Sequence, residues 1–492
     1  MRRFTRLDSS AVDLRELLGP GVPPVDITAL AYSSAAVRPG ALFFCVPGFR
    51  ADGHDFAPDA VERGAAALVC ERPLGLGIPE VVVPSAREAM GPAAAAFHGD
   101  PTAELKVVGI TGTNGKTTTA FLVRHLFEET GTQCGLLGTV KSVVGGREEE
   151  VERTTPEAVD LQATFARMLA AGDRACAMEV SSHALELGRA AGIRFSARVF
   201  TNLTQDHLDF HETMDAYFAA KRRLFEEPGL SVVNVDDEYG RRIAAEVEST
   251  TIGVHHDADF RARDVRFDLT GSTFTCATPE GELELRVPLP GLFNVQNALC
   301  ALAAVHGLGT DLVAAGEALA GFGHVPGRFE PVDEGQSFGV LVDYAHTPDS
   351  LDNVLRAARE VTEGRLVVVF GAGGDRDTAK RPLMGAAAHE LADRIVVTSD
   401  NPRSEDPEAI VDQVLAGAGP AAEREIDRRK AIARVIAEAD RGDVVVIAGK
   451  GHEQGQEFER GRKEPFDDRE VAREAIRARL GAQSGARGET TG

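Results

Sequence analysis

The chain has 492 residues, of which 43% are hydrophobic and 26% charged, an ordinary composition for a soluble globular protein. Its length predicts about three domains. The chain has no apolar run of roughly 18 residues and no secretory N-terminal segment, so we expect the protein to stay in the cytoplasm. The net charge of −23 argues against nucleic acid or an anionic membrane as the main partner, so phosphate groups would have to bind in local, amide-lined sites.

Residues 1–103 mix short apolar runs such as ALFFCVPG with alanine-rich helical stretches, and we predict that they form a first domain. The segment FHGDPTAEL at 97–105 is rich in turn residues and is predicted to be a linker. The six cysteines of the whole chain are scattered without any CxxC pair, so we expect reduced core residues rather than disulfides or metal ligands.

A second domain is predicted over 104–329. It opens with a buried strand, a glycine turn and an amphipathic helix, and further apolar strands follow at ACAMEV, ARVFTNL and SVVNVD. This alternation predicts an α/β domain with a mostly parallel sheet and helices on both faces. Segment 259–288 instead reads as short alternating strands, which predicts a small antiparallel addition.

A third domain is predicted over 330–480. The strands VLVDYA, RLVVVFG, DRIVVTSD and DVVVIAG again alternate with helical patterns, which indicates a second, Rossmann-like doubly wound α/β domain. The segment 481–492 is polar and rich in glycine, and we expect it to be a disordered tail.

The segment GITGTNGKTT at 109–118 lies between a predicted strand and a predicted helix. Glycines allow backbone N–H groups to close on phosphate oxygens, and the helix N-terminus adds partial positive charge. Lys116, whose side chain we expect to be exposed without nucleotide, can reach the β- and γ-phosphates of ATP, and the Thr117 hydroxyl can hold Mg²⁺. The alternative is a simple glycine turn with an exposed lysine. The predicted ATP-binding residues of this loop are Gly112, Thr113, Asn114, Gly115, Lys116, Thr117 and Thr118.

The loop departs from the usual P-loop, because Ile110 stands where the first glycine is expected. The form GTNGKT is found in Mur ligases and in folylpolyglutamate synthases. Further motifs follow in the order in which they occur in Mur ligases. The chain therefore resembles the Mur ligase family along nearly its whole length, and within that family it resembles the MurE type. These motifs are TTPE (154–157), EVSSH (179–183), TNLTQDHLD (201–209), AYFAAKRRLF (216–225), DYAHTP (343–348), GGDR (373–376), DNPR (400–403) and GKGHE (449–453).

The resemblance implies a catalytic centre of Lys116, Glu179, His207 and Lys221. Glu179 would bind one Mg²⁺ and His207 a second, while Lys221 would be carbamylated to N6-carboxylysine and brace a metal. Without the resemblance, Glu179 and Lys221 would be ordinary solvated residues. The cluster Asp206, His207, Asp209 and His211 could also suggest zinc.

The resemblance also assigns substrate contacts. Asn294 and Arg328 are expected to pack around ATP at the boundary between the second and third domains. Some positions depart from the family, namely Ser33, Ala35, Leu187 and Arg153, and these departures bear on individual contacts to the UDP-linked substrate. The expected contacts to that substrate are Ser34, Thr154, Thr155, Ser181 and Arg189.

The third domain is expected to hold diaminopimelate, whose far end carries one carboxylate and one ammonium group. Arg403 can bind that carboxylate with two parallel hydrogen bonds, and Glu453 can accept from the ammonium. Lysine lacks this carboxylate and would leave the guanidinium poorly paired. The expected pocket comprises Arg376, Asp400, Asn401, Pro402, Arg403, Gly449 and Glu453.

By resemblance, the chain is an ATP-dependent ligase that adds meso-2,6-diaminopimelate to UDP-N-acetylmuramoyl-L-alanyl-D-glutamate through an acyl phosphate, in peptidoglycan precursor synthesis. Mg²⁺ is the implied cofactor, and a monomer is expected. Three alternatives are a lysine-adding ligase of the same type, a folylpolyglutamate synthase, and a nucleotide-binding regulatory protein without turnover.

Overall fold

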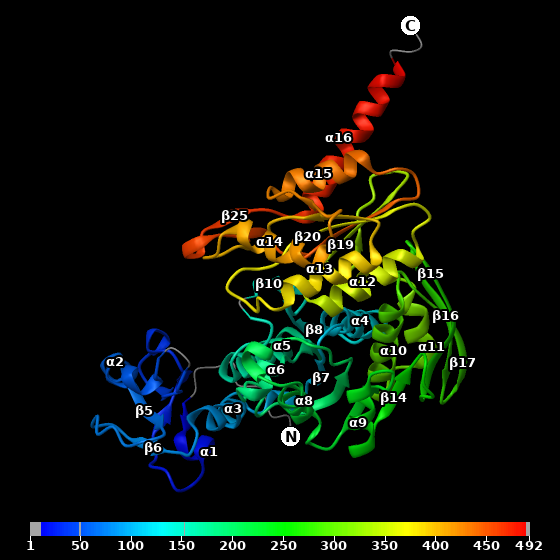
Figure 1. Ribbon diagram of the computed structural model, residues 1–492. Helices are drawn as coiled ribbons and strands as arrows, with labels where there is room; N and C mark the ends of the chain where they lie inside the picture. Colours follow the sequence, from blue (N-terminus) through cyan, green and yellow to red (C-terminus); the bar gives the residue numbers. More distant parts are fainter. Residues whose placement is uncertain (1–10, 49–50, 152, 489–492) are drawn as a thin grey trace.

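The computed structural model describes residues 11–48, 51–151 and 153–488. Three larger β-sheets with helices around them follow one another along the chain, and two further sheets have two strands each, β1-β2 and β24-β25. Figure 1 shows the N-terminal part in blue, the central part in cyan to green and the C-terminal part in yellow to red. The α/β class and the mostly parallel sheets predicted from the sequence are confirmed. The sheets lie within the three predicted ranges, while the exact domain boundaries stay predictions; residues 1–10 and 489–492 lie outside the described residues.

The N-terminal sheet has four parallel strands in the order β3-β4-β5-β6. The apolar runs ALFF and AAALVC become β4 and β5 because α1 and α3 cover one face of this sheet and α2 the other. Two short strands, β1 (Val12–Asp13) and β2 (Asp26–Ile27), pair beside it. The other elements are α1 (Leu14–Leu18), β3 (Ala29–Ala31), β4 (Ala41–Phe44), α2 (Ala57–Glu62), β5 (Ala65–Cys70), β6 (Glu80–Val82) and α3 (Ala86–Phe97), with 3₁₀ turns at Ser34–Ala36, Gly53–Phe56 and Pro101–Ala103.

The central sheet has eleven strands in the order β10-β9-β8-β11-β7-β12-β13-β14-β15-β16-β17. Its middle strands run parallel, from β8 to β15 in that order. The strands are β7 (Lys106–Thr111), β8 (Cys134–Leu137), β9 (Ser142–Val144), β10 (Arg147–Glu149), β11 (Ala175–Glu179), β12 (Phe195–Phe200), β13 (Leu230–Asn234), β14 (Thr250–Gly253), β15 (Phe260–Asp268), β16 (Gly271–Thr278) and β17 (Gly281–Val287).

Helices cover both faces of the central sheet because neighbouring residues of each buried strand point to opposite sides. Val108 of β7 packs with α4, α10 and α11, whereas Val107 packs with α5, α8 and α9. The antiparallel addition predicted over 259–288 is confirmed, and β15, β16 and β17 extend the main sheet itself. The helices are α4 (Lys116–Glu129), α5 (Ala158–Ala171), α6 (Ser182–Glu186), α7 (Leu208–His211), α8 (Met214–Arg222), α9 (Glu238–Glu246), α10 (Leu292–Gly307) and α11 (Leu312–Leu319), with a 3₁₀ turn at Arg223–Phe225.

The C-terminal sheet has the order β18-β19-β23-β20-β21-β22 and is parallel except for β18. α12, α13 and α14 pack on one face, and α15 and α16 on the other, as expected for a doubly wound domain. The elements are β18 (Glu330–Pro331), β19 (Gly339–Asp343), α12 (Pro348–Glu360), β20 (Leu366–Phe370), α13 (Lys380–Leu391), β21 (Arg394–Val397), α14 (Pro407–Ala418), β22 (Glu423–Arg424), α15 (Arg428–Glu438), β23 (Val444–Ala448), β24 (Gly455–Glu457), β25 (Lys463–Pro465) and α16 (Asp468–Gly488), with a 3₁₀ turn at Glu459–Gly461.

The end of the chain differs from expectation. α16 runs from Asp468 to Gly488, so residues 481–488 continue a helix where we expected a disordered tail. Glycine and polar residues disfavour a helix only modestly, and a helix already anchored in the core can extend past them. Figure 1 shows this helix projecting away from the rest of the C-terminal part.

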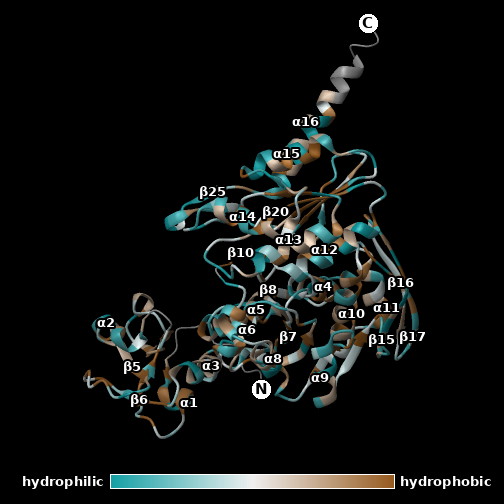
Figure 2. Cartoon of the chain, in the orientation of Figure 1, coloured by the Kyte–Doolittle hydropathy of each residue, from teal (hydrophilic) through white to brown (hydrophobic). Residues whose placement is uncertain are grey.

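Hydrophobic residues collect where the sheets meet their helices, and Figure 2 shows brown along elements such as β20 and α10 and teal over the β25 hairpin. The six cysteines are free and buried, as predicted. Within the described ranges, no helix combines the length and the apolar character needed to cross a membrane.

Candidate functional site

A cavity of about 520 Å³ lies between the central sheet and the segment that joins β19 to α12. β7, β11 and β12 are parallel and turn their carboxyl ends to it, which is where open α/β sheets bind ligands. Of the residues predicted for the site, the cavity is lined by Thr113, Asn114, Gly115, Lys116, Thr117, Thr118, Thr154, Glu179, Ser181, His207, Lys221, Asn294 and Arg328.

The loop between β7 and α4 requires glycine at two positions. Gly112 has a φ of 151°, and a Cβ there would lie 1.9 Å from the Thr201 hydroxyl oxygen. Gly115 has a φ of 86°, and a Cβ there would lie 2.4 Å from Oδ1 of Asn297. The loop can therefore lie close to β12 and α10, with the N-terminus of α4 directed at the cavity.

Lys116 is the first residue of α4, and its side chain folds back over the loop. Nζ donates to the carbonyl oxygens of Gly112 at 2.8 Å and Thr113 at 2.7 Å. We expected this side chain to be exposed, but it is half-buried. Burial lowers the pKa of Lys116. The two carbonyl groups replace water as partners, so the ammonium is already held beside the space that a phosphate would occupy.

Glu179 is the last residue of β11 and is 1% exposed. Its Oε1 accepts from the Thr139 backbone N–H at 2.7 Å, and its Oε2 accepts from the Thr139 hydroxyl at 3.0 Å. A Cβ on Gly138 would lie 2.4 Å from Oε1, so the glycine allows this turn to approach the carboxylate. The carboxylate is therefore fixed in orientation at the cavity wall.

Lys221 lies on α8 and is 1% exposed. Its Nζ donates to the Gly112 carbonyl oxygen at 2.8 Å and lies 4.7 Å from the centre of the Tyr217 ring. Burial, with the nearby Lys116 ammonium as a second cause, lowers the pKa of Lys221 well below its usual range. A neutral amine is the form that reacts with CO₂, so the surroundings of Lys221 suit carbamylation.

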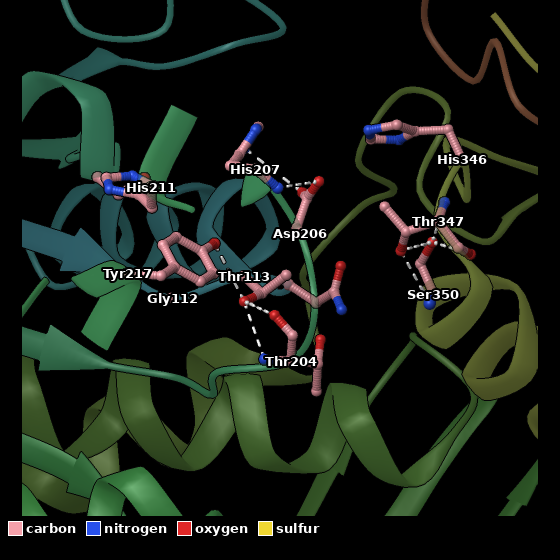
Figure 3. Close-up of polar contacts among 12 residues, drawn as sticks. Gly112, Thr113, Thr204, Asp206, His207, His211, Tyr217, His346, Thr347 and Ser350 are labelled. Atoms are coloured by element: carbon pink, nitrogen blue, oxygen red, sulfur yellow. Dashed lines mark hydrogen bonds and ion pairs between the residues drawn. The ribbon is translucent and has the colours of Figure 1, made fainter. Parts of the chain in front are cut away.

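His207 follows β12 in a left-handed conformation, with a φ of 53°. Its Nε2 lies 3.4 Å from Oδ2 of Asp206, and burial lowers the pKa of His207 to about 4, which favours the neutral, metal-binding form. Figure 3 shows His211 turned away from Asp206; its Nε2 lies 2.9 Å from the Ser182 hydroxyl oxygen. The four residues considered for zinc therefore do not share one centre. Among the described residues, no three His, Cys, Asp or Glu side chains form a metal-binding group.

The side chains present fit a divalent cation that prefers oxygen ligands. The Thr117 hydroxyl and the Glu179 carboxylate both line the cavity, and both offer oxygen donors of the kind that Mg²⁺ binds. Thr117 Oγ1 accepts from Nη2 of Arg328 at 3.2 Å, which holds the hydroxyl near the domain boundary. Thr117 and Glu179 therefore each offer oxygen donors to the cavity.

Arg328 and Asn294 belong to the central part and lie at its boundary with the C-terminal part. The Arg328 guanidinium lies 4.4 Å from the centre of the Tyr344 ring, close enough for a cation–π contact. Asn294 is 2% exposed and donates to the Pro290 carbonyl oxygen at 2.8 Å, so part of its bonding capacity stabilises the start of α10. Both side chains line the cavity, as predicted for the nucleotide site.

The residues predicted to bind the UDP-linked substrate are only partly brought together. Thr154 and Ser181 line the cavity. Thr155 donates to the Glu179 carbonyl oxygen at 2.9 Å and is buried beneath it. Ser34 lies in the N-terminal part, where its hydroxyl hydrogen bond holds the pKa of Asp59 below its usual value.

Three guanidinium groups converge on the buried Glu157 carboxylate. Arg87 lies 3.2 Å from it, Arg153 3.1 Å and Arg189 2.9 Å. Arg87 comes from α3 of the N-terminal part and was missed by sequence reasoning, because nothing in its local pattern marks it. Three cations around one anion leave positive charge that an anionic substrate group could use.

The DNPR and GKGHE segments meet around a lysine that the sequence analysis did not single out. Lys450 is fully buried and donates to Oδ1 of Asn401 at 2.7 Å and to Oε2 of Glu453 at 3.1 Å. Burial alone would raise the pKa of Asp400, but the charges of Lys450 and Arg428 bring it below its usual value. Its place inside GKGHE was the signal that could have identified Lys450.

Arg403 adopts a left-handed conformation with a φ of 50°. Its Nε donates to Oε2 of Glu457 at 2.9 Å, and its Nη1 donates to the Gly374 carbonyl oxygen at 2.7 Å. These contacts fix the guanidinium and join the DNPR loop to the GGDR loop, where Arg376 is exposed. A Cβ on Gly449 would lie 3.0 Å from Oδ2 of Asp400, so glycine lets the two segments meet. Pro402 lies against Gly374, where a Cβ would come 1.9 Å from the Pro402 carbonyl oxygen.

Three family models match successive parts of the chain. The model described as Mur ligase family, catalytic domain matches residues 26–99, Mur ligase middle domain matches 110–305, and Mur ligase, glutamate ligase domain matches 327–451. A protein of Streptomyces coelicolor named UDP-N-acetylmuramoyl-L-alanyl-D-glutamate--2,6-diaminopimelate ligase is 49% identical, over 96% of this chain and 98% of its own length. A protein of the same name from Geobacillus thermodenitrificans is 48% identical, over 92% and 96% of the two chains.

Solved structures show the same relationship. A structure titled UDP-N-acetylmuramoyl-L-alanyl-D-glutamate--2,6-diaminopimelate ligase superposes with a TM-score of 0.71 at 33% identity, covering 96% of this chain and 99% of the other. A folylpolyglutamate synthase of Mycobacterium tuberculosis superposes with a TM-score of 0.60 at 20% identity, covering 74% of this chain and 93% of the other. The second match shows a shared fold alone.

Proposed function

The chain belongs to the Mur ligase family, and on that basis we propose that it is an ATP-dependent ligase that adds meso-2,6-diaminopimelate to UDP-N-acetylmuramoyl-L-alanyl-D-glutamate in peptidoglycan precursor synthesis. The names of relatives at 45–49% identity over most of the chain support this substrate pair. The product would be the tripeptide-bearing precursor, together with ADP and phosphate.

The observation that carries the proposed activity is the cavity at the carboxyl ends of β7, β11 and β12. It brings a helix N-terminus, Lys116, Glu179 and the buried amine of Lys221 to one side. The other side comes from the C-terminal part, namely Asp343, Tyr344, Ala345, His346, Asp349, Ser350, Asn353 and Val354. Phosphoryl transfer depends mainly on positioning and on offsetting negative charge, and this arrangement supplies both.

In the first proposed step, the D-glutamate side-chain carboxylate attacks the γ-phosphorus of ATP, and ADP leaves. The acyl phosphate that results has an activated carbonyl carbon, so the enzyme needs no serine or cysteine nucleophile. Backbone N–H groups at the start of α4 and the Lys116 ammonium would stabilise the charge that develops on the phosphate oxygens.

We propose two Mg²⁺ ions as cofactors, one held by Glu179 and a second by His207, with the Thr117 hydroxyl and carbamylated Lys221 as further ligands. When bound, the ions would offset phosphate charge and orient the phosphates for in-line transfer. The oxygen donors of Thr117 and Glu179 at the cavity wall support this assignment. The assignments of His207 and Lys221 rest on the family resemblance together with the neutral state that burial favours at both side chains.

In the second proposed step, the amine of diaminopimelate attacks the acyl phosphate, and a tetrahedral intermediate expels phosphate. Arg403 would bind the distal carboxylate of the amino acid, and Glu453 would accept from its distal ammonium. The Arg403 guanidinium is already oriented by Glu457 and Gly374, which lowers the entropic cost of binding.

The remaining assignments complete the proposal. Ser34, Thr154, Thr155, Ser181 and Arg189 would contact the UDP-linked substrate, and Asn294 and Arg328 would contact ATP. A nucleotide-linked precursor and ATP are cytoplasmic substrates, so we propose a cytoplasmic enzyme, active as a monomer.

An amino-acid panel tests the proposed function directly. Purified protein supplied with ATP, Mg²⁺ and the UDP-linked dipeptide is expected to form a new peptide bond with meso-diaminopimelate and to release phosphate only when both substrates are present. Mass spectrometry of the product and a phosphate assay measure this. A product formed mainly with L-lysine would point to the lysine-adding alternative. Nucleotide binding without turnover would point to a regulatory protein.

Replacing Arg403 with alanine is expected to narrow the preference for diaminopimelate over lysine. The change removes a charge-assisted contact to the distal carboxylate, and hydrogen bonds to charged groups contribute about 1.5–3 kcal/mol. We therefore expect kcat/KM for diaminopimelate to fall at least about tenfold, with a much smaller loss for lysine. Steady-state kinetics with each amino acid measures the ratio.

Lysine is the matched control in that experiment, because it has the same chain and ammonium but lacks the distal carboxylate. Equal losses with both amino acids would mean that Arg403 only supports the loop through Glu457 and Gly374. The assignment of Arg403 to the substrate carboxylate would then be wrong.

A further inference from the structure

One carboxylate of the C-terminal part reaches across the domain boundary to the phosphate loop. Asp349 lies in the first turn of α12, and its Oδ2 accepts from Nδ2 of Asn114 at 2.9 Å and from the Thr204 hydroxyl at 2.8 Å. Asn114 belongs to the loop after β7, and Thr204 follows β12. A single acceptor from the C-terminal part therefore joins two loops of the central sheet.

The rest of Asn114 is held from within the central part. Its backbone N–H donates to Oδ1 of Asn202 at 2.9 Å, and its carbonyl oxygen accepts from the Thr201 hydroxyl at 2.6 Å. Only its side chain reaches the C-terminal part. Asn114 thus has its backbone fixed by β12 and its side-chain amide fixed by α12.

Thr204 connects the same contact to the neighbouring loop residue. Its backbone N–H donates to the Thr113 hydroxyl at 3.0 Å, and the Thr113 hydroxyl lies 3.2 Å from the Tyr217 hydroxyl. Figure 3 shows Thr113, Thr204 and Tyr217 on one side of the site and Thr347 and Ser350 of the C-terminal part on the other. A shift of Asp349 would therefore affect two consecutive residues of the phosphate loop.

The Asp349 carboxylate is also held in place by residues of its own helix. Thr347 and Ser350 form a reciprocal capping box around the start of α12, and Pro348 occupies the first helical position. Nδ2 of Asn353, one turn further along, donates to the same Oδ2 at 3.1 Å. The carboxylate is therefore oriented by its own helix before it meets the central part.

From these contacts we propose that Asp349 is a positioning residue of the ligation reaction: it fixes Asn114 and Thr204, and through them the phosphate loop, when the C-terminal part lies against the central sheet. The proposal deepens the proposed function and rests on it. Ligation of three substrates needs the domains to close, and this contact makes the shape of the nucleotide site depend on that closure. If the two domains separated, Asn114 and Thr204 would both lose the Asp349 carboxylate as their acceptor.

Asp349→Ala is expected to raise the KM for ATP about tenfold, the size of effect that the loss of one hydrogen bond to a charged group produces. The KM values for the UDP-linked dipeptide and for diaminopimelate should stay unchanged. Asp349→Asn retains an oxygen that can accept from Asn114 and Thr204, and it should recover most of the loss. Thermal unfolding of both variants should match that of the unchanged protein, which excludes a general loss of structure.

Asp352→Ala is the matched control, because Asp352 lies on the same helix but is paired on the exterior with Arg356 at 2.7 Å. It should leave the KM for ATP unchanged. The double variant Asn114→Ala with Asp349→Ala should lose less than the sum of the two single variants, since the two changes share the contact between Asn114 and Asp349. Fully additive losses would overturn the proposal, because Asp349 would then act on the nucleotide directly. Equal rises in all three KM values would overturn it as well.

Titration of the variants with ADP separates this inference from the proposed function. ADP affinity should fall about tenfold in Asp349→Ala whichever amino acid the enzyme uses. An unchanged ADP affinity together with an unchanged KM for ATP would overturn the role of Asp349, even with ligation intact. Absence of ligation in the unchanged protein would contradict the proposed function, and the ADP titration would still decide the role of Asp349.

Discussion

Replacing Lys116 with alanine is expected to abolish measurable ligation while the chain stays folded. The Lys116 ammonium lies 2.8 and 2.7 Å from two carbonyl oxygens of its own loop and lines the cavity, so its charge is held where phosphate oxygens would develop negative charge. Loss of such a contact in a desolvated site lowers kcat on the order of 10²–10³-fold. A phosphate-release assay with all substrates present measures the effect.

Lys106→Ala is the control for that experiment. Lys106 begins the same strand, β7, but at the opposite end, and its Nζ donates to the Leu308 carbonyl oxygen at 2.9 Å. Its loss should leave ligation nearly unchanged. Turnover like that of the unchanged protein in Lys116→Ala, with circular dichroism showing a folded chain, would contradict the assignment of the nucleotide site.

Lys221→Ala is expected to lose most of the activity, for a different reason. We propose that the buried amine reacts with CO₂ to give a carbamate, whose negative charge would support a metal ion. The position of Nζ, 2.8 Å from the Gly112 carbonyl oxygen, places that group beside the phosphate loop. Addition of a short carboxylic acid should restore part of the activity, because it can occupy the space of the missing carbamate.

The neighbouring Arg222→Ala provides a control, because the Arg222 side chain is 43% exposed and pairs with Glu246 near the surface. It should keep nearly full activity. Labelling with ¹³CO₂ and observing a carbamate signal by NMR tests the modification itself. A fully active preparation of the unchanged protein that shows no such signal, and an electron-density map with a bare amine at Lys221, would mean that the lysine acts unmodified.

Local patterns in the sequence predicted most of the fold. Continuous apolar runs such as those of β11 and β23 indicated buried strands of parallel sheets, and the switch to helical periodicity marked α4, because these signals depend on residues close in the chain. The extension of the central sheet by β15, β16 and β17 was visible only as an alternating segment. Its attachment to β14 depends on pairing between strands, which periodicity does not report.

The sequence predicted those parts of the candidate site that lie in one continuous motif. It did not predict the parts that residues from distant segments form together. The loop at 109–118 carries its chemistry in consecutive residues, and Lys116, Glu179 and Lys221 do line one cavity. Arg87 and Asp349 were not singled out, because a lone arginine or aspartate has no local signature, and Lys450 was missed although it lies inside the GKGHE motif. Their roles come from partners far along the chain, namely Glu157, Asn401 and Asn114.

The sequence by itself therefore determined most of the segments that form strands and helices, and which loop can bind a phosphate group. Those properties follow from glycine, apolar spacing and side chains within a few residues of one another. Only the tertiary structure decided the burial that lowers the pKa of Lys221, the folded-back position of Lys116 and the contact between Asp349 and the phosphate loop. Burial lowers a pKa only when distant elements exclude water, and a hydrogen bond across a domain boundary exists only when both domains are in place.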